Sequence, residues 1–248
     1  SKTTSFEAET VMPEDPTPHI GVDGAKSGWF AVWRSGGGFG FDLYARAEHL
    51  IAAHSDADVI AVDIPIGLSD RDGRAPDALA RRFVGGKRAS SVFSAPVRGV
   101  LDAQSRAEAS DRHRLIDGRG FGAQAFAILP KIREWDTLLR GDAQARRRVR
   151  EIHPEVSFAA MNAGVGLVPS KRSDEGHALR VQLLGGHFGL GAVEAMVASV
   201  PRRLAAADDV VDALAALWSA ERIAAGRAGS LPSPPAVDSA GLQMAIWY

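Results

Sequence analysis

The sequence predicts a single α/β domain in which helices flank a mixed β-sheet. Three observations predict it. Short apolar runs typical of strands fill much of residues 19–63, with helical spacing after the third run. Helical spacing then dominates most of the chain that follows. One later apolar run, starting near residue 149, returns to strand character. Strands that alternate with helices in this way are typical of α/β proteins.

Composition limits the classes of protein that the chain can belong to. The 248 residues are 46% apolar and 24% charged, with a net charge of −1, which is ordinary for a globular protein that buries a core. The absence of cysteine excludes disulfides, thiolate metal sites and a cysteine nucleophile, and fits a cytoplasmic location. No apolar stretch approaches the roughly 20 residues of a membrane span, so we expect no membrane partner. Residues 1–18 are polar and predict a flexible tail before a domain over 19–248.

The first part of the domain predicts a meander of three strands. Residues 19–22, 29–33 and 39–44 are rich in β-formers and are separated by short turns, which favours antiparallel pairing. A helix is expected over 47–53. Residues 58–63 are almost continuously apolar, which indicates a buried strand, and Pro65 prevents its continuation.

The rest of the chain predicts mainly helices. A mostly helical insertion is expected at about 70–148, with helices over 75–83, 103–116 and 124–139, the last started or kinked by Pro130. A strand is expected over 149–156, helices over 173–184, 193–199 and 208–225, a proline-rich loop over 232–235 and a closing strand over 244–248. This order of elements is that of the ribonuclease H-like fold.

Two aspartates stand at the ends of apolar strands. Asp23 ends the first strand and precedes Gly24, and Asp63 is the only charge after the fourth run. If the two strands are neighbours, the carboxylates converge where ligands bind in open α/β sheets. Two close anions repel unless a cation lies between them, and Mg²⁺ or Mn²⁺ suits such oxygen ligands. The alternative is that each aspartate merely caps a turn.

Three further aspartates begin the late helix. Asp208 suits the N-cap position, where an acid is favoured by the helix dipole. Asp209 and Asp212 are three residues apart and share a helix face, and Ala213 and Ala216 are small enough for close approach to a sheet. Asp212 is therefore a candidate third metal ligand beside Asp23 and Asp63, with Asp209 assisting. Capping and solvation are the alternative.

The predicted strand over 149–156 carries two more candidates for catalysis. Strand periodicity places His153 and Glu155 on one face, where either could approach the metal or the scissile group. A histidine here could act as a general base or a proton shuttle. A structural histidine is an equal alternative.

Several cations and hydroxyl groups are candidates for phosphate contact. The predicted substrate-binding residues are Lys87, Arg88, Ser90, Ser91, Lys131, Lys171 and Arg180. The basic residues also cluster, in one group between Arg71 and Arg88 and in a second between Arg140 and Arg150. Such groups form a local basic groove or, alternatively, solvated helix faces.

Several motifs of the chain occur in the order of one known family. They are Gly21-Val22-Asp23-Gly24, Asp63-Ile64-Pro65-Ile66-Gly67, the segment from Lys87 to Phe93, the segment from His153 to Phe158, and Asp209-Val210-Val211-Asp212-Ala213. From about residue 19 onward the chain resembles the domain of unknown function 429 family, described as predicted ribonuclease H-like nucleases. It departs from the family at Ala25, often a small residue or cysteine there, and at Lys26-Ser27, often arginine-glycine.

The resemblance implies a mixed sheet with a helical insertion and an acidic site formed by Asp23, Asp63 and the late-helix aspartates. The pattern is also similar to that of Holliday-junction resolvases, whose sites bind two metal ions for phosphodiester hydrolysis. We therefore expect a metal-dependent nuclease that acts on nucleic acid. The alternatives are a hydrolase of nucleotides or phosphate esters, an actin-like ATPase or sugar kinase, and a non-catalytic module that binds nucleic acid or protein. A homodimer is compatible with the sequence.

Overall fold

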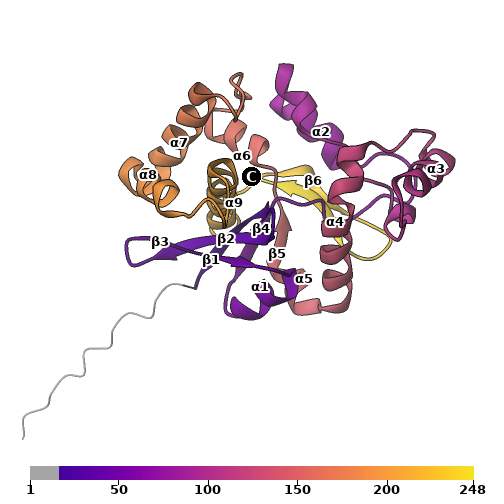
Figure 1. Cartoon of the computed structure of the whole chain (residues 1–248), viewed down its shortest axis with the longest axis horizontal. Coiled ribbons are helices and arrows are strands. Elements are labelled where there is room, and N and C mark those ends of the chain that lie inside the picture. Colours follow the sequence, from indigo (N-terminus) through magenta and orange to yellow (C-terminus); the bar gives the residue numbers. More distant parts are fainter. Residues whose placement is uncertain (1–16) are drawn as a thin grey trace, which may run out of the picture.

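The computed structural model describes residues 17–248 (Figure 1), and most of the predicted tail lies outside these residues. Among the described residues, five strands form one mixed sheet in the order β3-β2-β1-β4-β5. They are β1 (His19–Ala25), β2 (Gly28–Ser35), β3 (Gly38–Tyr44), β4 (Val59–Val62) and β5 (Val149–Glu151). β1, β2 and β3 pair antiparallel, whereas β4 pairs parallel with both β1 and β5. The predicted meander and mixed sheet are confirmed.

The helices cover both faces of this sheet (Figure 1). They are α1 (Ala47–Ala53), α2 (Ala75–Val84), α3 (Arg106–Asp117), α4 (Ala123–Gly141), α5 (Ala143–Arg148), α6 (Pro154–Met161), α7 (Asp174–Phe188), α8 (Leu190–Ser199) and α9 (Ala207–Ala224), with 3₁₀ turns η1 (Gly86–Ser91) and η2 (Arg98–Val100). The chain from α2 to α5 connects β4 to β5. Pro130 lies inside α4 and does not start it. In residues 17–248, none of the helices combines the length and apolar character needed to cross a bilayer.

Alternation along the strands separates two apolar cores. Ile20 and Val22 of β1 pack in a core that includes Leu50 of α1 and Trp135 of α4. Phe30 of β2 packs in the opposite core with side chains of α6, α7, α8 and α9. Because successive side chains of a strand point to opposite faces, the short strands supply both cores and hold the helices in place.

The structure corrects two predicted elements. The strand predicted over 149–156 ends at Glu151, and α6 begins at Pro154. Proline suits the first turn of a helix because the backbone N–H groups there have no partner within the helix, so the N–H that proline lacks is not missed. The loop predicted over 232–235 lies inside β6 (Ser230–Val237), which pairs antiparallel with β7 (Gln243–Trp247). A two-stranded ribbon tolerates these prolines because its pairing is irregular between Leu231 and Ala236.

Candidate acidic site at the strand ends

Asp23 and Asp63 meet at the carboxyl ends of two adjacent parallel strands. Asp23 lies in β1, and Asp63 directly follows β4, where its backbone N–H donates to Val22 O at 3.0 Å. Both side chains line one pocket of about 680 Å³. The parallel register of β1 and β4 therefore brings together the two aspartates that the sequence places at strand ends.

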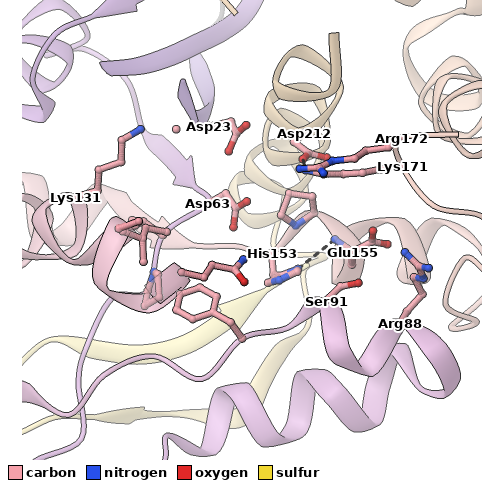
Figure 2. Close-up of a pocket in the computed structure, with 18 of the residues that line it drawn as sticks. Asp23, Asp63, Arg88, Ser91, Lys131, His153, Glu155, Lys171, Arg172 and Asp212 are labelled. Atoms are coloured by element: carbon pink, nitrogen blue, oxygen red, sulfur yellow. Dashed lines mark hydrogen bonds and ion pairs between the residues drawn. The ribbon is translucent and has the colours of Figure 1, made fainter. Parts of the chain in front are cut away.

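Asp212 reaches the same pocket from α9. The helix lies so close to β1 that a Cβ added to Gly21 would lie 2.2 Å from both Ala213 O and Leu217 N. Only glycine at this position of the strand lets the helix backbone approach so closely. Asp212 is 3% exposed and Asp23 is 8% exposed. Figure 2 shows Asp23, Asp63 and Asp212 facing one cavity, with Lys131 at one end of the group and Arg88 at the other.

The three carboxyl groups are electrostatically coupled. Burial, followed by the charges of Asp63 and Asp212, raises the pKa of Asp23 well above its ordinary value. Burial and the charge of Asp212 raise the pKa of Asp63 to about 8. Burial raises the pKa of Asp212 to about 6, although Lys171 opposes the shift. Ionising all three groups at neutral pH thus requires additional positive charge in the pocket.

Lys171 supplies part of that charge. Its Nζ lies 2.6 Å from Asp212 Oδ2 and 3.9 Å from Asp208 Oδ2. Burial lowers the pKa of Lys171, but Asp212, followed by Asp23 and Asp63, raises it above its ordinary value. Lys131 is held differently, by donating to Ala25 O at 2.7 Å and Gly28 O at 3.1 Å. Its Nζ also lies 4.8 Å from the centre of the Trp29 ring. The two lysines are thus fixed on either side of the carboxylates.

The carboxylates suit a hard divalent cation by their chemistry. In the described part of the chain, no protein donor hydrogen-bonds to the carboxylate of Asp23 or Asp63, although both groups lie in the pocket floor. Buried carboxylates without donors favour either protonation or a bound cation. As the side chains stand within residues 17–248, no group of three or more His, Asp or Glu residues is arranged to hold a metal ion. Asp212 is held by Lys171 instead.

Glu155 and Arg180 bind each other. Arg180 Nη2 donates to Glu155 Oε1 at 2.7 Å and Oε2 at 2.9 Å, and Arg180 is 1% exposed. The arginine also donates to Gly176 O and Pro169 O, so it joins α6 to the start of α7 and to the loop before it. Glu155 lines the pocket, but its charge is matched by a buried guanidinium rather than left for a ligand.

His153 is the N-cap of α6. Its Nδ1 accepts from the backbone N–H of Glu155 at 3.2 Å, and burial lowers the pKa of the ring to about 4. The expected strand face shared by His153 and Glu155 is wrong, because the chain turns into a helix between them. Its capping role leaves His153 neutral at pH 7 and places its ring on the pocket wall.

Of the remaining predicted residues, some line the acidic pocket and the others lie outside its lining. Arg88 and Ser91 line the acidic pocket, while Lys87 lines a neighbouring groove and Ser90 Oγ donates to Lys87 O at 3.0 Å. Asp209 is not among the residues that line the pocket, and its carboxylate accepts from the Ala206 N–H at 3.1 Å. The cap of α9 is therefore Ala206 rather than the expected Asp208.

A buried ion network holds the loop that follows Asp63. Arg74 donates to both carboxylate oxygens of Glu151, at 2.6 and 3.0 Å, and to Asp77 Oδ1 at 2.7 Å. It also donates to the carbonyls of Ile66 and Gly67, and the Ile66 N–H donates to Glu151. Arg74 is 2% exposed, so it contributes neither to a basic groove nor to a solvated helix face, the two alternatives for the cluster of basic residues between Arg71 and Arg88.

Comparison with known families identifies the family of the chain but gives no information on the site. A family model described as "Protein of unknown function (DUF429)" matches residues 21–237. The chain belongs to the DUF429 family. Neither the curated proteins nor the solved structures contain a match to it. The resemblance of the sequence motifs to this family is thereby confirmed.

Several residues that line the pocket of this DUF429 protein are not among the predicted site residues. Gln124 and Ile128 line it from α4 together with Lys131, and Arg172 lines it beside Lys171. The three α4 residues have the spacing of one helix face, so the prediction of Lys131 as a site residue could have been extended to Gln124 and Ile128. Trp29 lines the pocket as well, and its indole N–H donates to Glu134 Oε2 at 3.1 Å.

Proposed function

We propose that this DUF429 protein is a metal-dependent phosphodiesterase of the ribonuclease H-like kind that acts on nucleic acid. The observation that supports it best is the meeting of three carboxyl groups, from β1, the end of β4 and α9, in one pocket that also contains cations. Carboxylates hold a divalent metal, and cations hold a phosphate, so a phosphodiester suits both parts of the pocket.

Asp23, Asp63 and Asp212 are the residues that would hold Mg²⁺ or Mn²⁺. When bound, the ion supplies activation of a water molecule and stabilisation of the leaving oxygen. Because Lys171 holds Asp212 at 2.6 Å, metal binding competes with this lysine for the carboxylate. A displaced Lys171 ammonium remains beside the pocket, where it can contact a substrate phosphate.

The other side chains bind and orient the substrate. Arg88, Lys131 and Arg172 line the pocket around the acids and offer positive charge to a phosphate. Glu155 is neutralised by Arg180, and His153 caps α6, so we assign both residues to positioning rather than to proton transfer. The Arg74–Glu151 pair holds the loop after Asp63 through Ile66 and Gly67, so we assign it to positioning of that loop.

A metal-independent phosphate-binding module is the second candidate. The Lys171–Asp212 pair favours it, since a lysine already supplies a cation to the acids. Cleavage assays separate the two candidates, with single-stranded, duplex, hybrid and branched substrates in Mg²⁺, Mn²⁺ or EDTA. We expect metal-dependent cleavage that Asp23→Asn abolishes and that Asp111→Asn, an exposed control on α3, retains. Binding without cleavage in any metal would support the module instead.

A further inference from the structure

A second cavity adjoins the acidic pocket. This groove, of about 530 Å³, is formed by residues 83–88 on one side and by Gly164, Val165, Gly166 and Val168 on the other. We call it the valine groove. Arg88 contributes to the walls of both the valine groove and the acidic pocket. A ligand chain that leaves the acidic pocket past Arg88 therefore enters the valine groove.

The two walls of the valine groove are fixed to each other. A Cβ added to Gly166 would lie 2.0 Å from Val84 O, so the two segments touch through their backbones. Asn162 Nδ2 donates to Val165 O at 2.8 Å, and the Gly164 N–H donates to Ala159 O at 2.8 Å. The groove is thus held open by the fold, which lowers the cost of ordering it when a ligand binds.

The valine groove combines free positive charge with an apolar wall. Across residues 17–248, no carboxylate lies within ion-pair distance of Lys87 or Arg88, and the buried Nε of Arg88 has no hydrogen-bond partner. Val165 and Val168, by contrast, are 62% and 70% exposed. An anionic group suits the two cations and a flat apolar group suits the valines, and one nucleotide carries both.

The size of the groove selects among nucleic acids. A volume near 530 Å³ encloses one small ligand, on the order of one nucleotide. A duplex keeps its bases stacked and paired inside the helix, so it cannot lay a base against the valines. Unpaired bases can be turned out onto an apolar surface, as in single-stranded recognition.

We propose that the valine groove binds the nucleotide next to the one held in the acidic pocket, so that the substrate is single-stranded nucleic acid. This inference rests on the proposed phosphodiesterase function. Arg88 contacts the phosphate between the two nucleotides, and Lys87 contacts the phosphate that follows. The base of the second nucleotide packs on Val165 and Val168.

The test compares one phosphodiester that fits the acidic pocket alone with another that extends into the valine groove. Bis(p-nitrophenyl) phosphate is a phosphodiester small enough for the acidic pocket alone, whereas a single strand of about 12 nucleotides extends beyond it. With Mn²⁺, we expect Val165→Asp to lower the ratio of kcat/KM for the strand to that for the small ester by about tenfold. The matched control is Val237→Asp on β6, since Val237 is 64% exposed and lies outside the groove. An unchanged ratio in Val165→Asp, or cleavage of the duplex at the rate of the single strand, overturns the inference.

A binding measurement separates this inference from the proposed function. Fluorescence anisotropy with the labelled strand in EDTA needs no turnover. We expect Val165→Asp and Arg88→Gln each to weaken binding about tenfold, and Val237→Asp and Arg203→Gln to leave it at the wild-type value. If binding follows this pattern but neither substrate is cleaved, the proposed phosphodiesterase function is contradicted and nucleotide binding by the valine groove is supported. If all variants bind alike while metal-dependent cleavage is present, nucleotide binding by the valine groove is contradicted and the proposed phosphodiesterase function is supported.

Discussion

Lys171 and Asp212 form an ion pair at the acidic site, with Nζ 2.6 Å from Oδ2. The pair joins the loop before α7 to the first turns of α9, and Arg180 donates to Pro169 O of the same loop. Among the described residues, Asp23 and Asp63 lack an equivalent partner, so their carboxyl groups carry the largest unmet demand for positive charge in the pocket.

Replacing Lys171 tests whether the lysine and a metal ion compete for Asp212. We expect Lys171→Met to tighten Mn²⁺ binding about three- to tenfold, because the carboxylate no longer has a protein cation and the pair is partly solvent-exposed. Isothermal titration calorimetry measures the affinity. Lys26→Met, at an exposed position, is the control. Weaker or unchanged Mn²⁺ binding by Lys171→Met contradicts the competition.

The raised pKa of Asp63 predicts a stability that depends on pH. A carboxyl group whose pKa is about 8 in the folded state stabilises the fold fully below about pH 4, and this contribution is lost as the pH rises through 8. When the pH is raised from 6 to 9 without metal, the free energy of unfolding of wild type should therefore fall by about 1–3 kcal/mol more than that of Asp63→Asn.

Urea denaturation in EDTA at the two pH values measures the difference. Asp111→Asn, at an exposed position, should show the same fall as wild type. A parallel pH dependence of wild type and Asp63→Asn would show that the carboxyl group is not held protonated in the folded protein.

Removing Arg74 should be strongly destabilising. Arg74→Met leaves Glu151 and Asp77 buried without their shared cation, which costs about 3–5 kcal/mol. The matched control is Arg71→Met, since Arg71 is exposed in the same segment and should change stability by less than about 0.5 kcal/mol. Chemical denaturation measures both variants. Equal stability of the two would show that the network contributes little to the fold.

The contact between β1 and α9 can be tested at Gly21. We expect Gly21→Ala to prevent folding or to lower the free energy of unfolding by more than about 3 kcal/mol, because the added Cβ overlaps the α9 backbone at 2.2 Å. Gly38→Ala is the control, since its Cβ would lie 3.8 Å from Ser35 O. Circular dichroism during thermal unfolding distinguishes them, and a stable Gly21→Ala protein would contradict the close packing.

The sequence predicted the acidic site because its signals are local. Asp23 and Asp63 interrupt apolar strands, and the spacing of Asp212, Ala213 and Ala216 indicates one helix face against a sheet. The meander follows from three short runs joined by tight turns. The neighbouring positions of β1 and β4 were only a condition of the predicted site, and the structure supplies them.

The pairing of charged side chains could not be predicted in the same way. Glu155 and Arg180 are 25 residues apart, and Arg74 and Glu151 are 77 residues apart, so no spacing rule connects them. Arg71 and Arg74 have similar neighbours in sequence, yet one is exposed and the other is buried. Only the tertiary fold decides which cation meets which acid. The turn into α6 at Pro154 was missed because the apolar pattern of 149–156 continues across it.

The most direct test of the central claim is anomalous diffraction from crystals of the protein soaked in Mn²⁺. If Asp23 and Asp63 bind the catalytic metal, an anomalous peak lies between their carboxylates in wild type and is lost in Asp23→Asn crystals. A soaked wild-type crystal with no peak in the acidic pocket, and with Lys171 still bound to Asp212, would contradict the metal-dependent mechanism.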